Sequence, residues 1–238
     1  MKLSIIIPVY NEENTIGELV GKVQRVRLPI EKEIIVVDDG STDGTCQRLK
    51  EIDSPVQVIY QPFNQGKGAA VRLALERVTG DLVLIQDADL EYDPGEYPKL
   101  LAPFVSDHCR VVYGSRFSNV SGLAGLFSQH QKFHFWHLVY FLGNKFLTLV
   151  TKLLYGSSLT DMETCYKMLE TGLMKSLNLK ANRFEFEPEI TAKILKRKIR
   201  ICEVPISYHG REYSEGKKIS WRDGLSAIKV LIKCRFSD

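Results

Sequence analysis

Apolar and polar positions alternate in blocks along the first half of the chain. Short runs of Ile, Val and Leu are separated by longer stretches whose apolar residues recur at helical spacing. Such unbroken runs are typical of strands buried on both faces of a parallel sheet. We expect strands at residues 3–9, 33–37, 56–60, 82–86 and 110–114, and helices at residues 12–26, 42–51, 67–78 and 94–105. The alternation predicts βαβ units and a mostly parallel α/β sheet with helices on both faces.

The second half of the chain is less regular. Residues 115–131 are rich in Gly, Ser and Asn and predict a loop, and an apolar, aromatic-rich helix is expected at residues 133–155. A last amphipathic helix is expected at residues 221–234. Between these two helices we expect a strand near residues 165–169, a helix at 188–197 and a strand at 200–207. No linker or internal repeat interrupts residues 1–238, so the pattern predicts one domain.

Composition narrows the class of protein. The chain has 238 residues, of which 44% are hydrophobic and 26% charged, as in soluble globular proteins. Its net charge of +3 is too small to indicate nucleic acid, so no nucleic-acid partner is expected. Five single cysteines without CxxC spacing predict neither a zinc site nor a disulfide framework, and favour a reducing compartment. No apolar run reaches the ~20 residues that span a bilayer. We therefore expect a cytoplasmic or membrane-surface protein.

Two carboxylates follow the predicted strand at residues 82–86, in the motif Asp87-Ala88-Asp89. Unpaired buried charges are costly, so such groups are normally paired or bound to a metal. Mg²⁺ takes one or two carboxylates together with phosphate oxygens, which would suit this pair. A solvated pair of loop acids is the alternative, because an Asp-x-Asp motif is common by chance.

Other polar side chains follow neighbouring predicted strands. Tyr10 and Glu12 come after the first strand, Asp38 and Asp39 after the second, and Lys67 opens a helix in a Gly-flanked turn. Ligands of open α/β sheets bind beyond the carboxyl ends of the strands. A tyrosine there could stack on a base, a carboxylate could accept from a nucleobase or ribose, and the turn with its lysine favours an anion. Turns and helix caps use the same residue types, so a purely local role is the alternative.

These segments occur in one order along the chain. They are Pro8-Val9-Tyr10-Asn11-Glu12, Asp38-Asp39-Gly40-Ser41-Thr42-Asp43, Asn64-Gln65-Gly66-Lys67-Gly68 and Asp87-Ala88-Asp89. Together they resemble the family 2 glycosyltransferases of the GT-A fold. Three later motifs resemble the dolichyl-phosphate mannose synthase branch, which extends the resemblance over nearly the whole chain. They are Gly114-Ser115-Arg116-Phe117, Thr160-Asp161-Met162-Glu163-Thr164-Cys165-Tyr166-Lys167 and Glu203-Val204-Pro205-Ile206.

The resemblance implies an inverting transfer of mannose or glucose from a nucleotide sugar, GDP-mannose or UDP-glucose, to a dolichyl or undecaprenyl phosphate. It implies Mg²⁺ or Mn²⁺ as cofactor and a peripheral position on the cytoplasmic side of a membrane. Residues 1–115 would form the nucleotide-sugar half and residues 116–238 the acceptor half. The acceptor phosphate is already an anion, so no strong general base is required, and the enzyme must hold two anions together.

The resemblance also implies roles for individual residues. Donor binding falls on Pro8, Tyr10, Glu12, Asp39, Lys67, Asp87 and Lys217. The metal and diphosphate fall on Asp87, Asp89 and Glu91, and the catalytic groups are Asp89, Arg116, Lys167 and Arg211. Glu91 departs from the glutamine that is common in the family, and Lys167 stands where the family often has arginine. Lysine keeps the charge but loses the bidentate fork.

Three alternatives remain open from the sequence. The acceptor could be a hydroxyl, on a diacylglycerol or a glycan, which would need Asp161 as a base. The chain could also be a nucleotide-sugar binding module without turnover. Aromatic and lysine residues indicate that residues 133–155, and also 221–235, rest on a membrane surface, but packing on the domain itself, a membrane-protein partner or a homodimer would suit them too.

Overall fold

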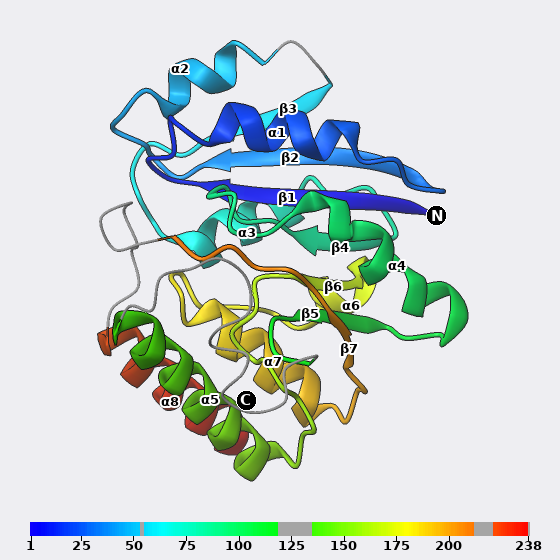
Figure 1. Ribbon diagram of the computed structural model, residues 1–238, viewed down its shortest axis with the longest axis vertical. Coiled ribbons are helices and arrows are strands. Elements are labelled where there is room, and N and C mark those ends of the chain that lie inside the picture. Colours follow the sequence, from blue (N-terminus) through cyan, green and yellow to red (C-terminus); the bar gives the residue numbers. More distant parts are fainter. Residues whose placement is uncertain (53–54, 119–134, 212–220, 238) are drawn as a thin grey trace.

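The computed structural model describes residues 1–52, 55–118, 135–211 and 221–237. Its strands are β1 (Lys2–Val9), β2 (Glu31–Asp38), β3 (Val56–Tyr60), β4 (Leu82–Ile85), β5 (Val111–Ser115), β6 (Lys167–Glu170) and β7 (Cys202–Pro205). They form one seven-stranded sheet in the order β3-β2-β1-β4-β6-β5-β7 (Figure 1). Only β6 runs antiparallel to its neighbours in this sheet.

Helices cover both faces of the sheet. They are α1 (Ile16–Arg25), α2 (Thr45–Lys50), α3 (Lys67–Leu75), the 3₁₀ turn η1 (Pro94–Glu96), α4 (Tyr97–Ser106), α5 (Phe135–Tyr155), α6 (Thr171–Ser176), α7 (Phe186–Lys196) and α8 (Trp221–Phe236). α1 and α4 lie on one face and α3 and α7 on the other, while α5 and α8 pack side by side next to α7 (Figure 1). The predicted α/β fold is therefore confirmed.

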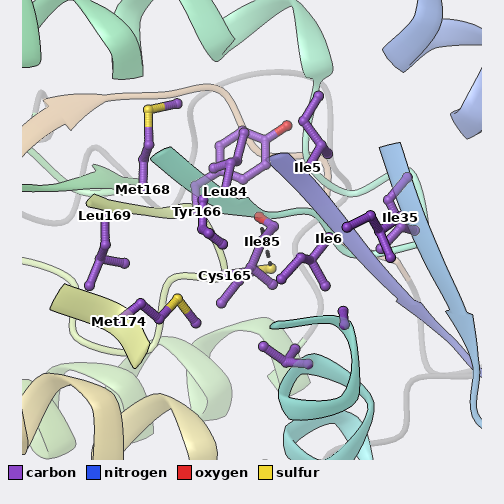
Figure 2. Close-up of a cluster of buried hydrophobic side chains, with 14 of the residues drawn as sticks. Ile5, Ile6, Ile35, Leu84, Ile85, Cys165, Tyr166, Met168, Leu169 and Met174 are labelled. Carbon is purple, nitrogen blue, oxygen red and sulfur yellow. Dashed lines mark hydrogen bonds between the residues drawn. The ribbon is translucent and has the colours of Figure 1, made fainter. Parts of the chain in front are cut away.

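The core lies on both faces of the central strands, as the unbroken aliphatic runs predict. Ile5 and Ile6 are fully buried and point to opposite faces of β1 (Figure 2). Leu84 and Ile85 of β4 are also fully buried and point to opposite faces of the sheet, near Tyr166 and the thiol of Cys165 (Figure 2). Burying each such side chain contributes about 1.5–3 kcal/mol, which holds the central strands in register.

Several predicted boundaries shift. The first helix begins at Ile16 and not at residue 12, because Asn11 adopts a left-handed backbone (φ 50°) and its side chain accepts from Thr42 N–H. α6 was not predicted, since six residues carry too little periodicity. Most of the predicted loop at 115–131 and the first two residues of the 133–155 helix lie outside the described residues. No helix in the described ranges is long and apolar enough to cross a membrane.

The topology gathers chain segments at one edge of the sheet. β1, β2, β4, β5 and β7 all end there, and the antiparallel β6 begins there. Because β6 and β7 pair with β4 and β5, residues from both halves of the sequence reach the same edge. The candidate site residues lie at this edge.

One disulfide forms, although the scattered cysteines predict no disulfide framework. Cys109 and Cys202 are joined by a disulfide that links the start of β5 to the start of β7. The two residues are 93 positions apart, and only the parallel pairing of β5 with β7 brings them together. Cys46, Cys165 and Cys234 remain free thiols.

Reduction of this disulfide is expected to lower the melting temperature, because the bridge closes a long loop in the unfolded chain. The expected cost is about 2–4 kcal/mol. Thermal unfolding with and without dithiothreitol measures this cost. A Cys109→Ser variant should have a lower melting temperature than the oxidised wild type, and dithiothreitol should not change it. Non-reducing peptide mapping that finds free thiols at both positions would contradict the prediction.

Candidate functional site

An arginine lies between two of the predicted site acids. Arg211 donates through Nη1 and Nη2 to the two carboxylate oxygens of the buried Glu12, at 3.0 and 2.9 Å. The same Nη2 lies 3.2 Å from Oδ2 of Asp89. A planar guanidinium is suited to such paired contacts. The structure thus brings together three residues that are far apart in sequence and that the sequence assigns to one site.

Glu91 is held by the segment that follows β7. Its carboxylate accepts from Tyr208 Oη at 2.6 Å and from Arg211 N–H at 2.7 Å, and its carbonyl accepts from His209 N–H at 2.9 Å. Both carboxylate oxygens therefore have protein donors in this structure. Glu91 anchors the chain that carries Arg211, a contact that the predicted metal role did not include.

A buried chain of charges lies beside the acid cluster. Lys67 Nζ is 2.7 Å from Asp87 Oδ1 and 2.8 Å from Glu187 Oε1. The other oxygen of Glu187 is 2.5 Å from Lys167 Nζ. Burial opposes the charged form of Lys67, but Asp87 and the other neighbouring acids outweigh it and raise the pKa of that lysine. Lys67 and Asp87 are thus paired with one another in this structure.

Lys167, which the resemblance makes a catalytic group, lies inside the protein. Its side chain is fully buried, and its ammonium group donates to the carbonyls of Met162 and Thr164 as well as to Glu187. All three donors are therefore used inside the protein. Lys167 supports Glu187 and does not reach a ligand here.

Four acids of the site lie close to one another and to two cations: Lys67 pairs with Asp87, and Arg211 contacts Glu12, Asp89 and Glu91. Burial raises the pKa of Asp89 to about 7, and Asp87 and Glu91 add to the shift. Carboxylate oxygens are the donors that Mg²⁺ and Mn²⁺ prefer, so the donor set and its charge fit a divalent cation. Within the described ranges, no three His, Cys, Asp or Glu side chains are grouped to hold a metal, and Arg211 supplies positive charge at Asp89.

The predicted nucleotide contacts border this cluster. The carboxylate of Asp39 accepts from the N–H groups of Gln65 and Gly66, at 2.8 and 2.7 Å. These donors belong to the turn that was expected to meet an anion, so the structure uses them to fix the turn before Lys67. Pro8 pairs with Val37 at the end of β1, and Tyr10 follows it, half-buried. Lys217 lies outside the described residues.

Arg116 is clamped by a single carboxylate. Its Nε, Nη2 and backbone N–H donate to Asp161 at 2.7, 2.8 and 3.0 Å, and Asp161 is fully buried. Burial would raise the pKa of Asp161, but Arg116 outweighs it and the pKa is lowered. In the described part of the chain, Nη1 of Arg116 has no hydrogen-bond partner. The guanidinium lies 5.0 Å above the ring of Tyr208, whose hydroxyl meets Glu91.

A hollow of about 400 Å³ opens beside Arg116, between α5 and the loop before β6. Its lining is Phe117, Ser118, Lys145, Thr148, Leu149, Lys152 and Thr160. Lys145 Nζ lies 4.3 Å from the ring centre of Phe117 and 3.4 Å from the carbonyl oxygen of Thr160. Ammonium groups and apolar side chains therefore share one hollow, which is the lining that an anionic head with an apolar tail requires.

Glu163 is a half-buried acid to which the sequence assigned no role. Its Oε1 has no hydrogen-bond partner within the described ranges. Burial raises its pKa to about 7, with Glu187 and Asp161 adding to the shift while Lys167 and Arg116 oppose it. The side chain is therefore partly protonated at neutral pH.

This shift predicts a pH dependence of stability. Between about 4.5, the ordinary pKa, and about 7, the folded chain binds more protons at Glu163 than the unfolded chain, so its contribution falls as the pH rises. Glu163→Gln should remove that fall and raise stability at pH 8. Urea unfolding at pH 5 and pH 8 measures it, with the exposed Glu170→Gln as control. Equal pH slopes for the wild type and Glu163→Gln would contradict the prediction.

Of the three residues that hold the site together, the sequence pointed only to Asp161, as the base for a hydroxyl acceptor. Glu187 joins two lysines, Asp161 clamps Arg116, and Tyr208 touches both Arg116 and Glu91. Two signals were present in the sequence: Glu187 precedes a proline at a helix start, and Tyr208 lies three residues before Arg211.

The mostly parallel seven-stranded sheet with helices on both faces is the architecture of the GT-A class. The family model for glycosyl transferase family 2 matches residues 4–160. The chain belongs to that family.

The relatives of this chain include sugar transferases, two of which are named for dolichyl or dolichol phosphate. A UDP-N-acetylglucosamine–dolichyl-phosphate N-acetylglucosaminyltransferase of Methanococcus voltae is 30% identical, with 88% of this chain and 86% of the relative covered. The low-salt glycan biosynthesis hexosyltransferase Agl6 of Haloferax volcanii is 28% identical over 97% of this chain. The dolichol-phosphate mannosyltransferase of Pyrococcus furiosus is 35% identical over 49% of this chain. The chain spans 53% of the Haloferax protein and 34% of the Pyrococcus protein.

Solved structures support the fold. Glucosyl-3-phosphoglycerate synthase from Mycobacterium tuberculosis, in complex with Mn²⁺, UDP and glucosyl-3-phosphoglycerate, superposes with a TM-score of 0.72. The match covers 100% of this chain and 81% of that one at 21% identity. The GT-A expectation is confirmed.

Proposed function

We propose that this chain transfers a hexose from a nucleoside-diphosphate sugar to a polyprenyl phosphate, with inversion at the anomeric carbon. The observation that carries the proposal is the position of Tyr208. Its hydroxyl donates to Glu91 of the acid cluster, and its ring lies under the guanidinium of Arg116. Tyr208 therefore separates Arg116, which would bind the acceptor anion, from the acids that would bind the donor. The reaction needs this proximity of two anionic substrates.

The donor would lie against the acid cluster. Tyr10, Glu12 and Asp39 would bind the nucleoside, and Arg211 would leave Glu12 and Asp89 to contact the diphosphate. A divalent cation bound by Asp89 and Asp87 would supply positive charge for the departing diphosphate. Lys67 would keep Asp87 ionised and oriented, because the two side chains are 2.7 Å apart. The chain itself offers the basic groups Arg211 and Lys217 for closure over the diphosphate.

The acceptor phosphate would lie at Arg116 and Lys145, with its prenyl tail along Phe117 and Leu149. Its phosphate oxygen would form the new bond to the anomeric carbon, while the bond from that carbon to the diphosphate breaks and the nucleoside diphosphate leaves with the electron pair. No proton has to be removed from an anionic acceptor. Asp161 is fully buried and holds Arg116 through three contacts, which supports a phosphate acceptor over a hydroxyl that needs Asp161 as base.

Product analysis tests this function. Radiolabelled GDP-mannose and UDP-glucose are incubated separately with the protein, Mg²⁺ or Mn²⁺, and vesicles containing undecaprenyl or dolichyl phosphate. We expect radiolabel in the lipid extract with one donor, and none when the polyprenyl phosphate is omitted. Transfer only to diacylglycerol or to a soluble glycan would overturn the acceptor. Nucleotide binding without transfer or hydrolysis would indicate a binding module.

We also propose that α5 and α8 rest on the membrane that carries the acceptor. Four exposed side chains form one stripe along α5: Leu142, Phe146, Leu149 and Leu153. Their spacing of four, three and four residues places them on one face of the helix. The adjacent α8 exposes Leu225, Ile232 and Phe236. Lys145 and Lys152 of α5 and Lys229 and Lys233 of α8 supply charge for anionic lipid.

Vesicle binding tests the membrane surface. Leu149→Ser with Leu153→Ser should weaken co-sedimentation with anionic vesicles by about tenfold or more, since each leucine contributes on the order of 1 kcal/mol. Val105→Ser, which changes an exposed apolar residue on α4, should leave binding unchanged. If the double variant binds vesicles normally but loses a dimer seen by light scattering, the face is a homodimer interface.

The cytoplasmic side of the membrane remains our prediction for the location. Disulfides are rare in the cytosol, so the Cys109–Cys202 bridge tests this prediction. Rapid thiol trapping in cells should find both cysteines reduced if the protein faces the cytoplasm. A fully oxidised pair would contradict that location.

A further inference from the structure

The edge strand β7 carries an acid whose role the proposed reaction leaves open. Glu203 belongs to the motif Glu203-Val204-Pro205-Ile206, and it lies opposite Tyr113 in the parallel pairing of β7 with β5. Its side chain leaves the sheet toward the loop before β6.

The carboxylate of Glu203 binds two consecutive residues of that loop. Thr160 N–H donates to both oxygens, at 3.0 and 2.9 Å, and Asp161 N–H donates to Oε1 at 3.1 Å. The hydroxyl of Thr160 donates to Oε2 at 3.1 Å and also lies 2.6 Å from the hydroxyl of Ser115. One acceptor-only group thus satisfies three donors at the tip of the loop.

This contact continues directly to Arg116. The backbone that Glu203 holds is the backbone of Asp161, and Asp161 binds Nε, Nη2 and the backbone N–H of Arg116. Because these contacts fix the plane of the guanidinium, its remaining nitrogen, Nη1, is fixed in direction as well. The chain of contacts runs from β7 through the loop to the arginine without an intervening mobile side chain.

We propose that Glu203 is a positioning residue for acceptor binding, which acts by holding Thr160 and Asp161 so that Arg116 is aimed at the acceptor phosphate. The inference rests on the proposed function, in which Arg116 contacts that phosphate. A glutamine could keep one oxygen for the N–H groups of Thr160 and Asp161, but it would place an NH₂ group where Oε2 now accepts from Thr160, so the second contact of Thr160 N–H and the negative charge would both be lost. The arginine would then bind the phosphate in a less defined orientation.

A matched control exists at the opposite end of the sheet. Glu33 also accepts from backbone N–H groups, those of Thr79 and Gly80, and from the hydroxyl of Ser4. It makes no contact with the candidate site. Glu33→Gln should therefore reproduce the loss of stability that follows from removing a loop-holding carboxylate, without a change in acceptor binding.

The experiment measures binding of farnesyl phosphate, a short prenyl phosphate, and of UDP and GDP with Mn²⁺, by calorimetry on the full chain. Glu203→Gln should raise the dissociation constant for farnesyl phosphate by about tenfold and leave nucleotide binding unchanged. The double variant with Arg116→Ala should bind farnesyl phosphate no more weakly than Arg116→Ala alone. Glu203→Asp, which keeps the charge and is the variant to use if Glu203→Gln does not fold, should give an intermediate loss.

The outcomes separate the two proposals. If Arg116→Ala weakens farnesyl phosphate binding but neither Glu203 variant does, the positioning role is overturned and the acceptor assignment stands. Equal losses for nucleotide and farnesyl phosphate, or losses that multiply in the double variant, also overturn it, because both indicate a general structural effect. If Arg116→Ala binds farnesyl phosphate normally, the acceptor assignment fails and this inference fails with it.

Discussion

Asp89→Asn is expected to lower turnover by about 10³-fold while leaving the fold intact. Burial and the neighbouring charges of Asp87 and Glu91 disfavour the ionised form of Asp89, and Arg211 together with the backbone N–H of Glu91 offsets this only in part. A bound cation would therefore stabilise the ionised carboxylate. The neutral amide removes the negative charge and one of the oxygen atoms that would bind the metal. The loss should fall on kcat, because the charge that the cation balances grows as the diphosphate leaves.

Two measurements separate metal loss from misfolding. Electron paramagnetic resonance with Mn²⁺ and UDP or GDP should show weaker metal binding in Asp89→Asn, while its melting temperature stays at or above that of the wild type. The higher melting temperature is expected because a buried repulsive charge has been removed. Asp93→Asn is the matched control, since Asp93 lies on the same segment but only caps the next turn by accepting from Gly95 N–H. Unchanged Mn²⁺ affinity in Asp89→Asn would contradict the metal assignment.

The sequence could predict the edge of the sheet at which the site lies, because the carboxyl ends of parallel strands meet there. Glu12, Asp39 and Asp89 each follow a buried aliphatic run, and the structure places all three at that edge. Such an argument needs only local patterns and one rule of topology. It also led correctly to the α/β class, since the core is formed by the same runs.

Contacts between distant segments could not be predicted in this way. Lys167 is basic and adjacent to a family motif, but it is the first residue of β6, where alternate side chains point to opposite faces. Which face its side chain takes depends on the position of Glu187 on α7, and only the tertiary structure gives that position. The clamp of Asp161 on Arg116 joins residues 45 positions apart, and the Cys109–Cys202 bridge joins residues 93 positions apart. No spacing rule reports such pairs.

Glu187→Gln is expected to lower the free energy of unfolding by about 3–5 kcal/mol, because it removes one partner from a buried charge network. Glu187 contacts Lys67, whose side chain is 12% exposed, and Lys167, which is fully buried. Lys67 keeps Asp87 as an ionic partner, whereas Lys167 would keep two carbonyl oxygens and at most the amide oxygen of the new glutamine, and would lose the anion it pairs with. Urea unfolding measures the loss, and the same change at the exposed pair Glu170–Arg110 should cost no more than about 1 kcal/mol.

A compensating variant distinguishes an unpaired charge from a packing defect. Replacing both partners, as Lys167→Met with Glu187→Leu, removes the charge together with its counterion, and such apolar replacements are often close to neutral. The double variant should therefore recover most of the stability that Glu187→Gln loses, and the two single changes should be strongly non-additive. If the double variant loses as much free energy of unfolding as the two single variants together, side-chain packing and not charge pairing stabilises the cluster. Recovery of stability without recovery of turnover would show that Lys67 needs Glu187 as well as Asp87 to keep the acid cluster in its active arrangement.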